Sequence, residues 1–395
     1  MSTLSFNLQD KSILTSSSLS VNMAAQVLAH TASIENLIQT HQTDHLMNRG
    51  SPTEPQNTPT TQDTQCTQQN EPELLSPIQN ILANYKFQSE FLAKYSLGTE
   101  LGSGGFGFVA YGTRREDNQE VAIKFILKDK VPYQSWVQDA ELGAIPIEVH
   151  LLKNIRHKNI VKYFDCFQDS CYVYLVMEYH GSEWVPNAKG MPKVQSTNHC
   201  DMAYFEQQQQ SSKERPRLVK RQTSCDLFEC IEQCNRLPEN IAKHVFRQIV
   251  SCIGYLHSRG VCHRDIKDEN IVIDADYNIK LIDFGSAIVL PRRNCYLDRF
   301  CGTITYAGPE ILLGQVYRPE PAEIWSLGVL LYTILYGQTP FANPAQAIHG
   351  KYTQPKVRSS IACLQLLDSM LEKDPRKRAT IQDILRHPWI QHDIV

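Results

Sequence analysis

One stretch decides the fold of this chain: His263-Arg264-Asp265-Ile266-Lys267-Asp268-Glu269-Asn270. It places an asparagine five residues after an aspartate, which is typical of a loop that orients a hydroxyl group and binds a divalent cation. Asp283-Phe284-Gly285 follows the strand-like run Ile279-Lys280-Leu281-Ile282 and adds a second hard oxygen ligand. The two motifs in this order predict a phosphoryl-transfer site.

Four residues of these motifs have separate predicted tasks. Asp265 orients the substrate hydroxyl and accepts its proton, and Lys267 neutralises charge on the transferred γ-phosphoryl group. Asn270 and Asp283 bind the metal ion, which we expect to be Mg²⁺, with Mn²⁺ as an alternative. Phosphoryl transfer requires little covalent chemistry from the protein, so these residues act through position and charge.

A glycine-rich run lies upstream: Gly102-Ser103-Gly104-Gly105-Phe106-Gly107. Its spacing alone also fits a plain tight turn or a dinucleotide-binding fold, in which the glycines open a helix. Here two strand-like runs follow the glycines, Phe108-Val109-Ala110-Tyr111 and Val121-Ala122-Ile123-Lys124. This context predicts a β-hairpin over a nucleoside triphosphate, with Lys124 on the α- and β-phosphates.

Lys124 requires a fixed partner, because a flexible ammonium group positions phosphate poorly. Glu148 is our candidate, since Pro146 predicts the start of a helix and Glu148 lies between apolar positions of that helix. Glu141 is the competing candidate. We predict that Lys124 and Glu148 form an ion pair and act together in catalysis.

Strand-like runs come first along the chain and helices come later. Tyr172–Met177 is a further strand, Glu239–Leu256 is an amphipathic helix, and Glu323–Tyr336 is apolar nearly all round, as a buried helix would be. We predict an α+β fold with two lobes. The N-lobe would hold a small antiparallel β-sheet and one main helix, and the larger C-lobe would be mainly helical.

Three regions differ in composition. Residues 1–85 are rich in Ser, Thr, Gln and Asn and are predicted to be largely disordered, with local helices at Met23–Ile38 and Leu74–Phe87. We expect the second helix to pack on the domain that follows. Residues 95–392 would form the catalytic domain, and 183–224 fits neither periodicity, which predicts a surface insertion.

Composition limits the classes of partner. The chain has 39 Lys and Arg against 42 Asp and Glu, a net charge of −3 without the basic bias of a nucleic-acid-binding protein. Its 12 scattered cysteines are typical of a reducing compartment. We find no signal-peptide pattern and no apolar run of about eighteen residues, so we expect no membrane insertion. We expect an intracellular protein of the cytoplasm, with the nucleus as an alternative, and a monomeric catalytic domain.

These elements occur in the order of the protein kinases from about Tyr95 to His392, and more narrowly they resemble the catalytic domain of the PAS-domain serine/threonine kinases. The stretches that carry the narrower resemblance include Trp136-Val137-Gln138-Asp139, Val176-Met177-Glu178-Tyr179-His180-Gly181 and Lys280-Leu281-Ile282-Asp283-Phe284-Gly285-Ser286-Ala287. The resemblance implies transfer of phosphate from ATP, with magnesium, to Ser and Thr of protein substrates in nutrient or metabolic signalling. Lys267, two residues after Asp265, is the serine/threonine pattern.

The resemblance also implies the nucleotide site. Hinge residues Glu178-Tyr179-His180 would present backbone groups to adenine, with Met177 behind them, and Asp226 would contact the ribose. The full implied set is Leu101, Gly102, Ser103, Gly104, Gly105, Phe106, Gly107, Val109, Ala122, Lys124, Met177, Glu178, His180, Asp226, Glu269 and Val272.

Substrate preference follows from a comparison with the cyclic-AMP-dependent kinase. Asp226 and Glu269 match the carboxylates that select arginine three residues before the phospho-acceptor, whereas Thr305 and Thr333 replace the acids used for the next position. We therefore expect an R-x-x-S/T preference. Ser224 follows Arg221 by three residues and is a candidate for autophosphorylation.

The segment after Asp283 bears on substrate seating and control. Thr303 would place a hydroxyl near the substrate, and Glu310 would pair with Arg378. Kinases with arginine before the catalytic aspartate often require a phosphate on this segment, but Leu297-Asp298-Arg299-Phe300 has no Ser or Thr. We predict activity without such phosphorylation, with Asp298 as the partner of Arg264.

Glu323 stands where most kinases have Asp, and we expect it still to accept N–H groups of the catalytic loop, the stretch from His263 to Asn270.

Two other classes of protein remain as alternatives. A catalytically impaired pseudokinase scaffold predicts loss of Lys124, Asp265 or Asp283, all of which are present. A small-molecule kinase would lack the segment from Gly302 to Glu310 that seats a peptide.

Overall fold

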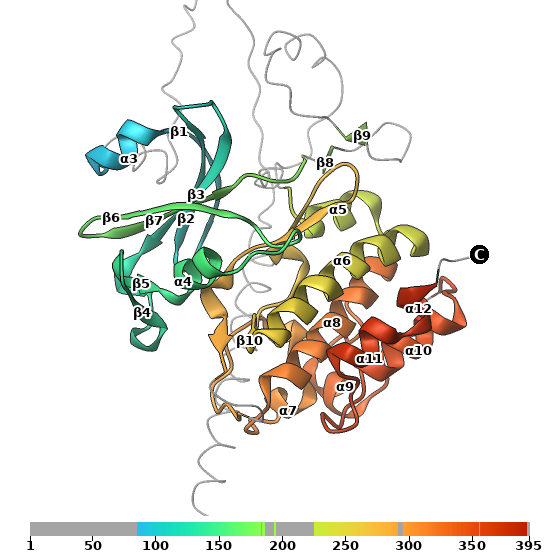
Figure 1. Ribbon diagram of the computed structural model, residues 1–395. Helices are drawn as coiled ribbons and strands as arrows, with labels where there is room; N and C mark the ends of the chain where they lie inside the picture. Colours follow the sequence, from blue (N-terminus) through green and yellow to red (C-terminus); the bar gives the residue numbers. More distant parts are fainter. Residues whose placement is uncertain are drawn as a thin grey trace, which may run out of the picture. The chain divides into compact units, whose positions relative to one another are not determined.

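Figure 1 shows the computed structural model of the chain. The structure describes residues 85–182, 225–290, 295–354 and 356–392, together with the backbone of 184–185 and 193–194. Several predictions fall outside the described residues: the disordered region, the helix at Met23–Ile38, most of the helix at Leu74–Phe87, and Ser224. Of the predicted insertion, only the backbone of the strand pair β8 (Trp184–Val185) and β9 (Lys193–Val194) is described.

The N-lobe contains the predicted antiparallel sheet, with five strands in the order β1-β2-β3-β7-β6. The strands are β1 (Tyr95–Gly104), β2 (Gly107–Arg114), β3 (Glu120–Leu127), β6 (Tyr163–Gln168) and β7 (Tyr172–Glu178). A hairpin of β4 (Trp136–Asp139) and β5 (Gly143–Pro146) leads into α4 (Ile147–Asn154), the main helix of this lobe.

Side chains alternate along β3, so the strand contributes to both faces of the sheet. Val121, Ile123 and Phe125 join an aromatic cluster on one face. Ala122 belongs to the main core, which also holds Val149 and other buried residues of α4. The same period of two places Lys124 on the Ala122 face, and this local rule brings the lysine toward α4.

The aromatic cluster extends beyond the predicted start of the domain. Helix α3 (Ser89–Lys94) precedes β1, and its Phe91 is fully buried. The Phe91 ring lies 6.1 Å from that of Phe125 and 5.1 Å from that of Tyr174. Tyr85 donates a hydrogen bond to Asp169 at 3.0 Å. The N-lobe therefore includes residues from Tyr85 onward, some of which the sequence left between the two predicted regions.

The C-lobe is mainly helical, as predicted (Figure 1). Its longest helices are α6 (Glu239–Ser258) and α8 (Pro319–Tyr336). Shorter helices surround them: α5 (Leu227–Cys234), α7 (Pro309–Leu312), α9 (Pro344–His349), α10 (Ile361–Met370), α11 (Ile381–Arg386) and α12 (Pro388–Gln391). None of the described helices combines the length and apolar character that spanning a bilayer requires.

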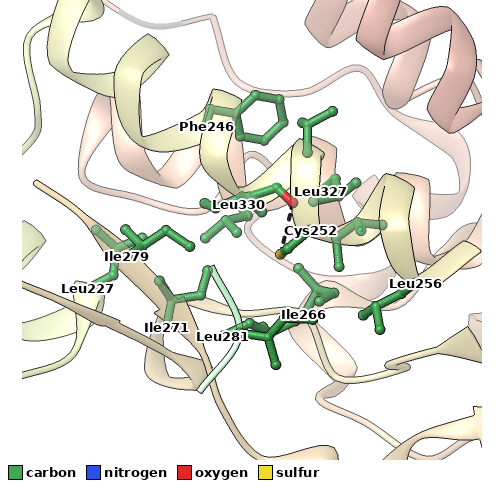
Figure 2. Packing of buried hydrophobic residues seen from close by; sticks show 14 of the residues in the cluster. Leu227, Phe246, Cys252, Leu256, Ile266, Ile271, Ile279, Leu281, Leu327 and Leu330 are labelled. Carbon is green, nitrogen blue, oxygen red and sulfur yellow. Dashed lines mark hydrogen bonds between the residues drawn. The ribbon is translucent and has the colours of Figure 1, made fainter. Parts of the chain in front are cut away.

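Burial explains why α8 is apolar nearly all round. Figure 2 shows Phe246, Cys252 and Leu256 of α6 in one cluster with Leu327 and Leu330 of α8. All five side chains are fully buried. Because neighbouring elements cover α8 on its several sides, apolar residues stabilise it at almost every position.

Two pairs of short strands position the catalytic loop. Strand β10 (Val261–Cys262) pairs with β13 (Ile288–Val289), and β11 (Ile271–Ile273) pairs with β12 (Ile279–Leu281). The stretch quoted first therefore begins where β10 ends and finishes where β11 begins. Asp283 follows β12, so pairing of β11 with β12 brings the two predicted motifs together.

Candidate active site

The glycine-rich run forms the turn between β1 and β2, with Gly104 opposite Gly107. Gly107 has φ +149°, and a Cβ there would lie 1.8 Å from the carbonyl oxygen of Phe125, so only glycine fits. A Cβ at Gly102, Gly104 or Gly105 would meet no atom within 4 Å. Packing does not require glycine at those three positions. We attribute the glycines there to phosphate binding, because the absence of side chains leaves the backbone N–H groups accessible to phosphate.

Lys124 contacts carboxylates of both lobes. Its Nζ lies 2.7 Å and 2.9 Å from the two oxygens of Glu148 and 2.9 Å from Oδ1 of Asp283. Burial alone would lower the pKa of Lys124, but the charges of Glu148 and Asp283 outweigh burial and raise it. The ammonium group is therefore charged and fixed. The competing Glu141 is largely exposed and pairs with Lys153 at 2.8 Å.

Asp283 has an unusual backbone, with φ +59° and ψ +76°. Lys124 is the main cause that holds the pKa of Asp283 at about 2, and the N–H of Gly285 donates to the same carboxylate at 3.2 Å. The next residue, Phe284, is fully buried, and its ring lies 4.9 Å from that of His263. The ring anchors the turn while the carboxylate stays ionised beside Lys124.

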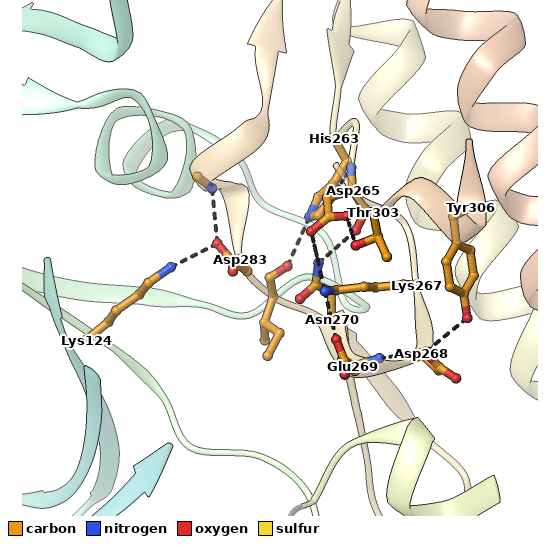
Figure 3. Close-up of polar contacts among 12 residues, drawn as sticks. Lys124, His263, Asp265, Lys267, Asp268, Glu269, Asn270, Asp283, Thr303 and Tyr306 are labelled. Atoms are coloured by element: carbon orange, nitrogen blue, oxygen red, sulfur yellow. Dashed lines mark hydrogen bonds and ion pairs between the residues drawn. The ribbon is translucent and has the colours of Figure 1, made fainter. Parts of the chain in front are cut away.

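Asp265 accepts hydrogen bonds from two side chains (Figure 3). The Thr303 hydroxyl donates to Oδ1 at 2.8 Å, and the Asn270 amide donates to Oδ2 at 3.0 Å and to the Asp265 carbonyl oxygen at 2.7 Å. Lys267 lies 3.8 Å from Asp265 and 2.7 Å from Glu269. One ammonium group, one hydroxyl donor and one amide donor therefore converge on the predicted catalytic aspartate.

The donor set of the predicted metal site suits a hard divalent cation. Because its amide nitrogen makes both bonds to Asp265, Asn270 can offer a cation its amide oxygen. Asp283 adds an ionised carboxylate, and oxygen ligands of this kind are those that Mg²⁺ prefers. The N–H of Ile282 donates to the Asn270 carbonyl at 3.0 Å, which ties the two ligand segments together.

Glu323 of α8 holds the backbone of the catalytic loop, as the sequence predicted. Its Oε1 accepts the N–H groups of His263 at 2.7 Å and Arg264 at 2.9 Å. Arg264 has φ +67°, a conformation that these bonds stabilise. Burial acts to raise the pKa of Glu323, but the hydrogen bond with His257 at 2.6 Å, the charge of His257 and the backbone N–H of Arg264 together outweigh burial and lower it. Sequence reasoning did not identify His257.

The predicted nucleotide residues occupy both lobes. Ala122 and Met177 are opposite each other in the β3–β7 register and are buried. Leu101 and Val109 are half-buried and pack against the same core. Val272 is half-buried on β11 of the C-lobe. Phe106, at the tip of the glycine turn, is exposed.

The hinge is fixed by contacts of its own. The backbone N–H of Glu178 donates to the carbonyl of Lys162 at 2.8 Å, so this group is engaged in the protein and not open to adenine. The Glu178 carboxylate pairs with Lys280 at 3.0 Å. His180 contacts the carbonyl of Asn278 at 3.1 Å through its ring.

Asp226 has a structural task that the sequence analysis missed. It is the N-cap of α5, and its side chain accepts the N–H of Glu229 at 2.8 Å. An acidic residue followed three positions later by glutamate is a capping signal that could have revealed this task. Asp226 also bridges to Val272, so it lies beside one of the predicted nucleotide residues.

The predicted pairing of Arg264 with Asp298 is wrong. In the part of the chain that the structure describes, Arg264 makes no ion pair with Asp298, which is exposed. Arg264 donates instead to the carbonyl of Ser286 at 2.6 Å. Backbone hydrogen bonds between Leu297 and Tyr317, at 2.8 Å and 2.9 Å, hold the segment around Asp298.

Comparison with known proteins agrees with this geometry. The sequence pattern of the family described as "Protein kinase domain" matches residues 95–200 and 191–390. The chain belongs to the protein kinase family. It is a serine/threonine-protein kinase related to the PAS kinases. Kinases of this family use ATP and divalent metal ions to phosphorylate protein substrates.

Three relatives illustrate the match. The PAS domain-containing serine/threonine-protein kinase of Mus musculus is 38% identical over 307 residues, 78% of this chain and 19% of that protein. Serine/threonine-protein kinase PSK2 of Saccharomyces cerevisiae is 33% identical over 295 residues, with 74% and 23% covered. Serine/threonine-protein kinase pim-2 of Danio rerio is 32% identical over 318 residues, with 78% and 88% covered. The kinase thus spans about a fifth of the length of the first two relatives.

Proposed function

We propose that this kinase is catalytically competent without phosphorylation of its activation segment, the residues between Asp283 and Glu310. One observation carries the proposal: unmodified side chains already form the contacts of Lys124 with Glu148 and Asp283 and the contact of Thr303 with Asp265. Catalysis of phosphoryl transfer depends on such positioning.

Other contacts hold residues 295–310 of the activation segment without a phosphate group. Leu297 and Tyr317 exchange two backbone hydrogen bonds, and the Tyr317 hydroxyl donates to the carbonyl of Arg299 at 3.0 Å. Tyr317 is buried. We propose that this backbone pairing replaces the phosphate group that, in other kinases, pairs with the arginine before the catalytic aspartate.

Protein made in bacteria together with a phosphatase tests this proposal. We expect this unphosphorylated kinase to transfer phosphate to a peptide, and we expect Asp265→Asn, the negative control, to lose the activity. Mass spectrometry confirms that no phosphate is present. Unphosphorylated wild-type protein that is inert on every peptide of a library would refute competence.

For the metal, we propose Mg²⁺, bound by Asn270 and Asp283. The cation supplies positive charge to the phosphate oxygens when it is bound. Asp265 orients the substrate hydroxyl and accepts its proton, while Lys267 and Lys124 stabilise negative charge on the phosphates. We expect Asn270→Ala to raise the Mg²⁺ concentration needed for half-maximal activity, and an unchanged requirement would contradict the assignment.

For the substrate, we propose serine and threonine sites with arginine three residues before the acceptor. Glu269, a residue of the catalytic loop whose side chain is 46% exposed, supports this preference. Asp226 matches the second carboxylate of the comparison with the cyclic-AMP-dependent kinase. A peptide library provides the test. We expect Glu269→Gln to lower the enrichment of arginine at that position, whereas Glu141→Gln, in the N-lobe, leaves it unchanged. A library without arginine enrichment for the wild type refutes the proposal.

We also propose a role in nutrient or metabolic signalling, on the strength of the relationship to PAS kinases. The described cysteines form no disulfide, which supports a reducing compartment, and we propose the cytoplasm, with the nucleus as the alternative. We propose a monomer. Each of these three proposals has its own test. Phosphoproteomics of wild type against Asp265→Asn under a change of carbon source tests the signalling role. Imaging of a tagged chain tests the compartment, and light scattering tests the monomer.

A further inference from the structure

Asp268 is a buried carboxylate to which the catalytic roles above assign no task. It lies between Lys267 and Glu269 and begins the 3-10 turn Asp268–Asn270. Only 6% of the residue is exposed, and burial raises the pKa of its carboxyl group. A buried carboxylate is costly unless hydrogen bonds compensate for the lost water, so its partners show what the fold gains from it.

The main partner of Asp268 is Tyr306 (Figure 3). The Tyr306 hydroxyl donates to Oδ1 at 3.0 Å, and the backbone N–H of Glu269 donates to the same oxygen at 3.1 Å. Tyr306 is 7% exposed, and its carbonyl accepts the hydroxyl of Ser326 in α8 at 2.9 Å. Tyr306 therefore links the catalytic loop, the activation segment and α8.

The same short segment touches the catalytic loop at a second point. Thr303 precedes Tyr306 by three residues, and its hydroxyl donates to Asp265 at 2.8 Å. The N–H of Tyr306 donates to the Thr303 carbonyl at 2.9 Å, so the two residues close one turn. Attachment at Asp265 and at Asp268 fixes both the position and the angle of this turn, whereas one bond alone would let it pivot.

We propose that Asp268 is a positioning residue for the phospho-acceptor. Through Tyr306 it holds the turn Thr303–Tyr306 on the catalytic loop, so that the Thr303 hydroxyl remains on Asp265 and the substrate hydroxyl enters at a fixed place. The inference rests on the proposed catalytic competence. No hydrogen bond or ion pair of the described residues joins Asp268 or Tyr306 to Lys124, so the contacts of Lys124 with Glu148 and Asp283 do not depend on the Asp268–Tyr306 bond.

The test compares transfer to a peptide with slow hydrolysis of ATP in the absence of peptide. Tyr306→Phe removes one hydroxyl, and we expect kcat/KM for the peptide to fall about tenfold or more, as for loss of a hydrogen bond to a charged group. We expect ATP hydrolysis and the KM for ATP to stay within about twofold, since these need no seated peptide.

Two comparisons separate positioning from general destabilisation. Tyr332→Phe is the matched control, because Tyr332 of α8 is also buried and the substitution removes a hydroxyl that donates to the Thr353 carbonyl at 2.7 Å. We expect it to leave peptide phosphorylation unchanged. Asp268→Asn keeps an acceptor oxygen and should retain peptide activity within about threefold. Asp268→Ala should lose at least as much peptide activity as Tyr306→Phe, because it removes the acceptor of the Glu269 N–H as well as that of the Tyr306 hydroxyl.

The double variant Asp268→Ala with Tyr306→Phe should lose no more peptide activity than Asp268→Ala alone, because Asp268→Ala already removes the bond to Tyr306. Equal losses of peptide transfer and ATP hydrolysis, or losses that add in the double variant, would overturn the inference. If Tyr306→Phe does not fold, peptide phosphorylation by Asp268→Asn and by Asp268→Ala is compared instead, and equal activity of these two variants would overturn the inference. The peptide is chosen from a library by wild-type activity, so an inactive wild type would refute catalytic competence instead.

Discussion

The buried ion pair between Arg378 and Glu310 allows a quantitative test of what holds the C-lobe together. Nη1 and Nη2 of Arg378 donate to the two Glu310 oxygens at 2.7 Å and 2.9 Å, and the side chains are 0% and 5% exposed. Arg378→Met leaves the Glu310 carboxylate buried without its cation. Breaking such a pair from one side costs about 3–5 kcal/mol. At about 2–4 °C per kcal/mol for a domain of this size, the melting temperature should fall by about 6–20 °C.

Removing both charges should cost less than removing one. In Arg378→Met with Glu310→Met no unpaired charge remains, and exchange of a buried ion pair for apolar residues is often nearly neutral. The free energy of unfolding of this double variant should therefore lie above that of Arg378→Met alone. Such non-additivity is expected for two residues in direct contact.

Urea unfolding at pH 7, followed by circular dichroism, measures these free energies. Arg376→Met is the matched control, since Arg376 lies two residues away in a pair with Asp374 and its side chain is 88% exposed. We expect this control to stay within about 1 kcal/mol of the wild type. The reasoning is refuted if Arg378→Met also stays within about 1 kcal/mol, or if the double variant loses the sum of the two single losses.

Three further predictions concern the N-lobe. Lys124→Met should lower peptide phosphorylation at least about a hundredfold, because Glu148 and Asp283 lose the cation between them; a radiolabel transfer assay that found less than a tenfold loss would contradict this. Phe91→Ala should lower the free energy of unfolding by about 3–5 kcal/mol in urea, because the ring is fully buried, and a loss below about 1 kcal/mol would show that α3 is dispensable. Asp139→Asn should destabilise at pH 7 but not near pH 2. The hydrogen bond with Lys153 lowers the pKa of Asp139 from 3.8 to about 2, so the stabilisation is complete above about pH 4 and is lost as pH falls through the folded-state pKa. Urea midpoints of the wild type and of Asp139→Asn, measured from about pH 2 to pH 7, check this prediction. A difference between the two midpoints that does not change with pH would refute it.

Local patterns were sufficient for the lobes and for several contacts of the site. The glycine hairpin, the pairing of Lys124 with Glu148 and the pairing of Glu310 with Arg378 were predicted because each follows from a motif with a fixed order along the chain. Period two along β3 also gives the direction of Lys124 without any tertiary information. Such features depend on residue types within motifs, so they can be recognised from the sequence alone.

Contacts between distant residues without a motif were missed or predicted wrongly. His257 meets Glu323 across 66 residues, and Asp268 meets Tyr306 across 38. No periodicity reports such meetings, because they depend on how α6, α8 and the activation segment pack. Asp298 was expected beside Arg264 because it lies where other kinases carry a phosphate that pairs with this arginine, but backbone pairing of Leu297 with Tyr317 leaves Asp298 exposed.

The sequence by itself determined that this protein is a kinase, because phosphoryl transfer requires particular residue types at particular spacings, and Asp265, Asn270 and Asp283 satisfy that requirement along the chain. Only the tertiary structure decided which side chains besides Glu323 hold the catalytic loop. Tyr306 and Thr303 reach it from the activation segment, and hydrogen bonds depend on distance and direction in space, which the spacing of residues along the chain does not specify.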